Sequence, residues 1–126
     1  VETQADVRGE YDAVGCFYCA EEIGISPEEW RRVLACATDH LRPGGTFYMA
    51  ALAEMRSYHV VDAAGTRIDF PCAYVTESGV REALVDLGFS LERMRLERRS
   101  IDHSDCGVTA TLVVAAVLDR GPSSRA

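Results

Sequence analysis

The sequence contains no lysine and no asparagine, so its 13 basic side chains are all arginines. This bias is typical of a GC-rich genome, and we expect a bacterial source. Asp and Glu number 20, which leaves a net charge of −7 and argues against nucleic acid or an anionic membrane as a partner. No apolar run approaches the roughly 20 residues that a membrane-spanning helix needs. The longest run, residues 112–118, is typical of a core strand, and we predict a cytoplasmic protein.

A disulfide framework is also lacking. The chain has five cysteines, an odd number, and their spacing suits a reducing cytoplasm. Cys16 and Cys19 form a Cys-x-x-Cys motif, which invites a metal or redox hypothesis, but a zinc site needs a second nearby pair and the sequence has none. On a strand, residues three apart also point to opposite faces. We therefore expect buried thiols at this motif and no metal site.

The chain is organised around residues 41–49, which predict a helix end, a tight turn and a buried strand. Leu41 closes a helical apolar pattern, and Pro43 cannot continue a helix. The two glycines that follow Pro43 allow a sharp turn. Residues 46–52 then run apolar with little alternation, as a strand covered on both faces does.

A strand at residues 11–18 and a loop at 19–24 precede this turn, and a helix with a strong start signal follows them. Ser26 can cap that helix, Pro27 suits its first position, and Glu29 completes a capping box. Strand, helix, turn and strand together predict a β-α-β unit with a right-handed crossover and two parallel strands.

The rest of the chain predicts the closing elements of the same sheet. Thr76 caps a second helix and Gly88 stops it. A β-hairpin is expected at residues 57–61 and 66–70, and an amphipathic, strand-like stretch at 90–98. An acidic loop with a histidine at 101–107 leads into a final apolar strand at 108–118. We expect one domain over residues 11–118, after a lead-in at 1–10 and before a disordered tail at 119–126.

Three motifs have counterparts in a known superfamily: Tyr11-Asp12-Ala13-Val14, Leu41-Arg42-Pro43-Gly44-Gly45 and Val80-Arg81-Glu82-Ala83-Leu84. Together they resemble the C-terminal half of a class I S-adenosylmethionine-dependent methyltransferase. The loop Phe17-Tyr18-Cys19-Ala20-Glu21 is similar to the Cys-Leu-Glu loop of the nicotinamide, phenylethanolamine and thioether methyltransferase family. The resemblance covers residues 11–118 and implies an α/β fold. That fold is the second half of a Rossmann-like methyltransferase sheet, mixed but mostly parallel, with a closing antiparallel strand and flanking helices.

The superfamily holds its cofactor on a Gly-rich loop after the first strand and on an acidic residue that ends the second strand. The chain has neither motif, and its only paired glycines, Gly44 and Gly45, follow a helix. It therefore supplies about half of the expected sheet, as a fragment, as a half-domain that works with a partner, or as a remnant. A first strand left alone exposes an apolar edge. We predict that this strand pairs with the chain's own N-terminal half or with a second chain.

The resemblance also implies roles for particular residues. It places Phe17, Tyr18 and Cys19 beside the cofactor, although the two aromatic rings could equally belong to the core. It assigns Glu21 to a cationic or amine substrate, with a solvated loop acid as the alternative. The implied substrate-binding residues are Glu21, Glu54, Tyr58 and Asp105. No residue is assigned as catalytic with certainty.

The function implied by the resemblance is methyl transfer from S-adenosylmethionine to a small molecule, at an amine or an aromatic nitrogen. In this interpretation the chain is part of an enzyme and is inactive alone. The alternative is a non-catalytic, methyltransferase-like half-domain that acts as a dimerisation or regulatory module, which the missing Gly-rich loop favours. A third hypothesis, the far half of a nucleotide-binding dehydrogenase, is disfavoured by the Leu-Arg-Pro-Gly-Gly turn and by the closing strand.

Overall fold

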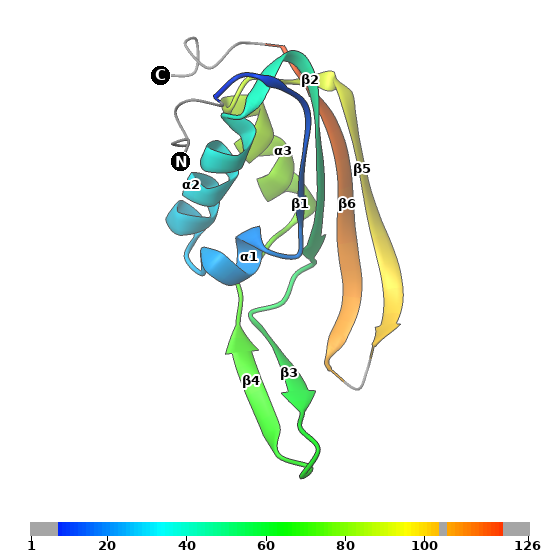
Figure 1. The fold of residues 1–126 in the computed structure, drawn as a ribbon. Helices are drawn as coiled ribbons and strands as arrows, with labels where there is room; N and C mark the ends of the chain where they lie inside the picture. Colours follow the sequence, from blue (N-terminus) through cyan, green and yellow to red (C-terminus); the bar gives the residue numbers. More distant parts are fainter. Residues whose placement is uncertain (1–7, 104–105, 120–126) are drawn as a thin grey trace.

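The computed structural model describes residues 8–103 and 106–119 of the chain. A four-stranded sheet in the order β1-β2-β6-β5 carries α1, α2 and α3 on one of its faces, and a two-stranded arm, β3-β4, extends from one end (Figure 1). The elements in chain order are β1 Tyr11–Phe17, α1 Ala20–Ile23, α2 Pro27–Thr38, β2 Leu41–Leu52, β3 Ser57–Val61, β4 Arg67–Pro71, α3 Glu77–Asp86, β5 Phe89–His103 and β6 Val108–Leu118. The predicted α/β class with a mixed sheet and flanking helices is confirmed, although among the described strands of this sheet only the β1–β2 pair is parallel, whereas the β2–β6 and β6–β5 pairs are antiparallel.

The predicted β-α-β unit is present, because β1 and β2 pair in parallel and α2 connects them. The start of α2 follows its local signals. The Ser26 hydroxyl accepts a hydrogen bond of 3.1 Å from the Glu29 backbone N–H, and Pro27 occupies the first helical turn. Trp30 and Leu34 on the inner face of α2 are buried against the sheet. The apolar spacing of this helix therefore serves packing, as the sequence indicates.

The boundary between α2 and β2 differs from the prediction. Leu41 does not close the helix, which ends at Thr38, but opens β2 opposite Tyr11. The register then shifts, so that the glycine turn lies within the strand as an irregularity. A Cβ atom on Gly45 would lie 2.9 Å from the Arg42 carbonyl oxygen, so glycine is needed for this close approach.

A further difference is at residues 19–24, where the prediction of a plain loop is wrong. This segment contains the short helix α1. Its four residues are too few to show a helical apolar period, which explains why the sequence pattern missed it.

The closing half of the sheet is antiparallel, with β6 between β2 and β5. The predicted hairpin is confirmed as β3 and β4, and α3 begins where Thr76 accepts a hydrogen bond of 3.0 Å from the Gly79 N–H. The strand β5 is longer than the predicted stretch at 90–98 and takes in residues 101–103 of the predicted loop. Arginines and glutamates on its exposed side mask the strand pattern in the sequence, whereas Met94 and Leu96 pack against the core.

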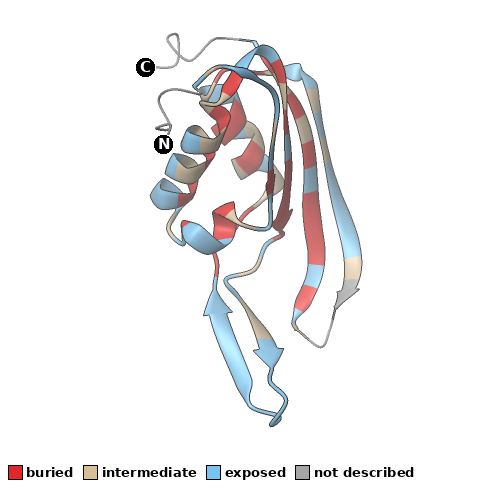
Figure 2. Cartoon of the chain, viewed as in Figure 1, coloured by how far each residue is buried: buried red, intermediate tan, exposed pale blue. Residues whose placement is uncertain are grey.

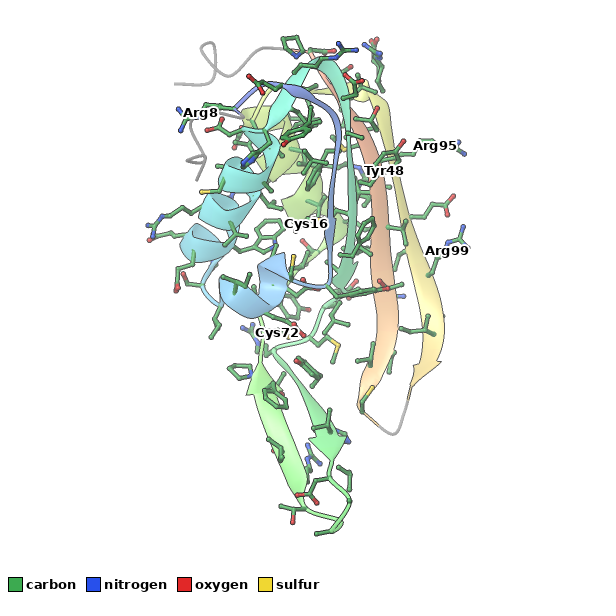
Figure 3. The ribbon with its side chains drawn as sticks, viewed as in Figure 1. Arg8, Cys16, Tyr48, Cys72, Arg95 and Arg99 are labelled. Atoms are coloured by element: carbon green, nitrogen blue, oxygen red, sulfur yellow. The ribbon has the colours of Figure 1, made fainter. Side chains whose placement is uncertain are left out.

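The main core lies between the helices and one face of the sheet (Figure 2). Phe47, Leu84 and Leu112 are among its fully buried side chains. The other face is exposed: Tyr48 is 45% accessible, and Arg95 and Arg99 project from β5 on the side away from the helices (Figure 3). Among the described residues, no helix has the length and apolar character to cross a membrane.

Candidate functional site

The candidate site lies where β1 and β2 both end. Because parallel strands have their carboxyl ends at the same edge of a sheet, the segment after Phe17 and the segment after Leu52 are neighbours there. The helix α1 follows β1 directly. The segment at residues 72–75 returns to the same edge, where the Ala73 N–H donates a 2.7 Å hydrogen bond to the Glu21 carbonyl oxygen. In α/β sheets, ligands bind at such edges.

A left-handed turn at Tyr18 shapes the start of this edge. Tyr18 has a φ of 54°, which is uncommon for a residue other than glycine, and its N–H donates a 2.7 Å hydrogen bond to the Ala50 carbonyl oxygen. Its hydroxyl lies 3.1 Å from the hydroxyl of Thr111, which donates in turn to the Ala51 carbonyl oxygen at 2.9 Å. The backbone of the turn and the tip of the tyrosine are thus fixed at two separate points.

The turn also brings the two cysteines of the Cys-x-x-Cys motif together. The Sγ atoms of Cys16 and Cys19 are 3.1 Å apart. The expectation that they point to opposite faces is wrong, because β1 ends at Phe17 and the strand rule does not extend to Cys19. Burial, followed by the hydrogen bond with Cys19, raises the pKa of the Cys16 thiol to about 12. Among the described residues, no group of His, Cys, Asp and Glu side chains is arranged to hold a metal ion.

Glu21 is the buried acid of the site, with 1% of its surface accessible. Its Oε2 atom accepts a 2.6 Å hydrogen bond from the Leu52 N–H, which ties α1 to the end of β2. Its Oε1 atom is buried and finds no hydrogen-bond partner among the residues that the structure describes. Burial raises the pKa of this carboxyl group, although the Leu52 hydrogen bond acts in the opposite direction. The alternative of a solvated loop acid does not fit this burial.

Tyr58 joins the same site from the β3-β4 arm. A hydrogen bond to Glu22 is the main cause that raises the pKa of Tyr58 to about 12, and the nearby carboxylate of Glu21 contributes to the same shift. The Tyr58 ring is stacked on Phe70 across the hairpin, with the ring centroids 5.4 Å apart. The structure therefore brings Glu21 and Tyr58 together, and Glu22 of α1 makes the hydrogen bond to the arm.

Glu54, another residue predicted to bind substrate, is not brought into this cluster. Glu54 has a φ of 56° and pairs with Arg98 of β5, whose Nε lies 3.1 Å from the carboxylate. Asp105 lies outside the described residues. Of the residues predicted to bind cofactor, Phe17 is 60% accessible and Tyr18 is 42% accessible, so neither ring is a core residue in this chain.

Sequence reasoning missed Glu22 and Thr111, and it also missed the Arg56 guanidinium, which lies 4.7 Å from the centre of the Tyr74 ring. The Glu22 contact depends on where the arm leaves the sheet, because Tyr58 lies at the start of β3. Thr111 lies in a β-branched apolar run, where a single hydroxyl is expected to serve packing. The sequence carries no local signal for these contacts, since each joins segments that are distant along the chain.

Comparison with known proteins identifies the family to which the chain is similar and the solved structures that share its fold. The model of the NNMT/PNMT/TEMT family matches residues 2–117. No curated protein matches the chain significantly.

Solved structures of methyltransferases share the fold. A SAM-dependent methyltransferase from Methanosarcina mazei has a TM-score of 0.64 at 15% identity, over 95% of this chain and 66% of that one. DhpI in complex with SAH has a TM-score of 0.56 at 13% identity, over 92% and 52%. The 1,6-didemethyltoxoflavin-N1-methyltransferase of Burkholderia thailandensis, with bound 1,6-didemethyltoxoflavin and S-adenosylhomocysteine, has a TM-score of 0.55 at 17% identity, over 89% and 46%. The chain thus spans about half to two thirds of the length of these proteins.

Proposed function

The chain belongs to the NNMT/PNMT/TEMT family, and on that premise we propose that it takes part in methyl transfer from S-adenosylmethionine to a small molecule, at an amine or an aromatic nitrogen. The observation that carries this proposal is the carboxylate of Glu21. It is buried at the carboxyl edge of the sheet, and one of its oxygen atoms has no partner among the described residues. A buried oxygen of this kind is costly unless a hydrogen-bond donor reaches it. An amine N–H of a bound substrate would supply such a donor.

The chemistry of the cluster suits an amine. The carboxylates of Glu21 and Glu22 give the edge a negative charge, which attracts a cationic or polarised nitrogen. Methyl transfer is an in-line displacement, in which holding the donor and the nucleophile in line supplies most of the rate. The raised pKa of Glu21 makes its Oε1 atom a better proton acceptor when the nitrogen becomes alkylated. The Tyr58 ring, stacked on Phe70, provides an apolar wall for the body of the substrate.

The cofactor would lie beside Phe17, Tyr18 and Cys19. Exposed aromatic rings at a strand end fit the flat adenine of S-adenosylmethionine. Its sulfonium supplies the electrophilic methyl group. This chain's own contribution is to orient the acceptor through Glu21 and to shield the edge with the β3-β4 arm. Glu54 and Asp105 stay as proposed substrate contacts.

We also propose that β1 pairs with the chain's own N-terminal half or with a second chain. Of the strands that the structure describes, only β2 pairs with β1, so the outer edge of β1 is open. The adjoining sheet face carries Tyr48 and Val113, 45% and 40% accessible, beside a groove of about 290 Å³ that Arg95 and Arg99 also line. An exposed strand edge is a surface that proteins normally cover.

The test is isothermal titration with S-adenosylmethionine, of the chain alone and of the chain mixed with the product of a neighbouring open reading frame. Binding only in the mixture supports a split enzyme. No binding in either sample favours the non-catalytic module. In an active complex, Glu21→Gln should raise the KM for an amine acceptor about 10- to 100-fold, because a charge-assisted hydrogen bond is lost. The exposed Glu92→Gln is the matched control, and an unchanged KM in Glu21→Gln would exclude the proposed role.

A further inference from the structure

The thiols of Cys16 and Cys19 are held in contact by elements on both sides of them. Cys16 lies in β1, where it is paired with Met49 of β2, and Cys19 is the residue directly before α1. The Cys19 carbonyl oxygen accepts hydrogen bonds from the N–H groups of Glu22 and Ile23, at 3.1 and 2.9 Å. The backbone geometry that brings the two sulfur atoms together is therefore fixed by the fold and does not depend on the sulfur contact itself.

A disulfide would require little rearrangement. The sulfur atoms are 3.1 Å apart, and a bond forms at about 2.05 Å, so they must approach by about 1 Å. The left-handed turn at Tyr18 already reverses the chain between the two cysteines. This turn makes Cys16, near the end of β1, and Cys19, at the start of α1, close neighbours.

The two thiols differ in their access to an oxidant. Cys19 is partly exposed, whereas Cys16 is 5% accessible. The raised pKa of Cys16 keeps its proton in place at neutral pH until a partner has reacted. Cys19 is therefore the thiol that meets a soluble oxidant, and Cys16 is the thiol that resolves the product.

We propose that Cys16 and Cys19 are a reversible dithiol-disulfide site that is oxidised by small disulfides such as oxidised glutathione. The Cys19 sulfur loses its proton to water and attacks oxidised glutathione, which forms a mixed disulfide and releases one glutathione thiol. The Cys16 sulfur then attacks the Cys19 sulfur, loses its proton to water and releases the second glutathione thiol. Two protein thiols are oxidised and one molecule of oxidised glutathione is reduced. The proposal concerns these thiols alone and does not depend on methyl transfer.

The experiment equilibrates the reduced full chain with glutathione buffers of increasing oxidised fraction, quenches with acid, alkylates the remaining thiols and digests with trypsin. The peptide of residues 9–31 contains Cys16 and Cys19 and no other cysteine. We expect it to lose both alkyl groups and to weigh about 2 Da less than the dithiol form, since two hydrogens are removed. Chymotrypsin, which cuts after Phe17 or Tyr18, should give fragments that separate only after reduction.

Two variants distinguish oxidation of the Cys16–Cys19 pair from oxidation of other thiols in the chain. Cys36→Ser removes an exposed thiol on α2 and should leave the result unchanged. Cys19→Ser should leave Cys16 fully alkylated at every buffer composition. Two results would overturn the proposal. One is that the peptide keeps two alkyl groups throughout, and the other is that Cys19 accumulates as a glutathione adduct while Cys16 stays alkylated.

Discussion

Replacing Glu21 by glutamine removes a charge that the fold buries, while it keeps an oxygen that can accept the Leu52 N–H hydrogen bond. In the folded chain, burial raises the pKa of the Glu21 carboxyl group above its ordinary value of 4.5. The native state therefore holds a proton that the unfolded state has already lost in the pH range between the two pKa values. Stability that Glu21 contributes in its neutral form is present below pH 4.5 and is lost as the pH rises through the folded pKa.

The size of this change in unfolding free energy follows from the same linkage between proton binding and folding. Relative to Glu21→Gln, the wild type should lose about 1.4 kcal/mol of unfolding free energy for each pH unit between its unfolded and folded pKa values. Above the folded pKa the difference should become constant, with glutamine the more stable residue. Glu21→Ala should behave differently, because it leaves the buried Leu52 N–H without an acceptor. That loss costs about 1–3 kcal/mol at every pH.

The assay is urea unfolding of the wild type, the two Glu21 variants and the exposed control Glu92→Gln, from pH 4 to pH 8. The control should stay within about 0.5 kcal/mol of the wild type throughout. If the difference in unfolding free energy between the wild type and Glu21→Gln stays constant over the whole range above pH 4.5, the folded pKa of Glu21 is not raised and the reasoning fails.

The remaining predictions concern the arm, the core and a helix cap. Tyr58 should ionise at about pH 12 because of its hydrogen bond to Glu22, and this late step in the tyrosinate absorbance should vanish in Tyr58→Phe but persist in variants of other tyrosines. Leu112→Ala, at a fully buried position, should lower the unfolding free energy by about 2–5 kcal/mol, whereas Leu91→Ala on the surface should change it by less than about 0.5 kcal/mol; equal losses would contradict the assignment of the core. Ser26→Ala should cost about 0.5–2 kcal/mol by removing the cap of α2, and Ser26→Asp should restore most of it in thermal unfolding.

Most of the secondary structure could be predicted from the sequence, because its signals are local. Ser26 and Thr76 cap their helices where the pattern places them, and the strand predicted at residues 108–118 is β6. The long strand β5 was underestimated, since its exposed face is charged and only alternate residues reach the core. The short helix α1 was missed, because one turn carries no periodic signal.

The candidate site could be predicted only in outline. The sequence places Glu21 in the segment after the first strand, and the resemblance gives it a substrate role. The sequence does not show that Glu21 is buried, or that its Oε2 atom accepts from Leu52, a residue 31 positions further along the chain. The contacts of Tyr58 depend on the angle at which the arm leaves the sheet, which no local pattern sets.

By itself, the sequence determined the α/β class, the parallel β-α-β unit, the hairpin and the family resemblance, because caps, breakers and apolar periods act over a few residues. Only the tertiary structure decided where β1 ends, and that single boundary changes the interpretation of the site. Ending the strand at Phe17 and turning the chain at Tyr18 places the Cys19 sulfur beside that of Cys16 and turns Glu21 inwards. The long-range pairing of β1 with β2 and the burial of Ala20 and Glu21 set this boundary, and neither can be seen in the local sequence pattern.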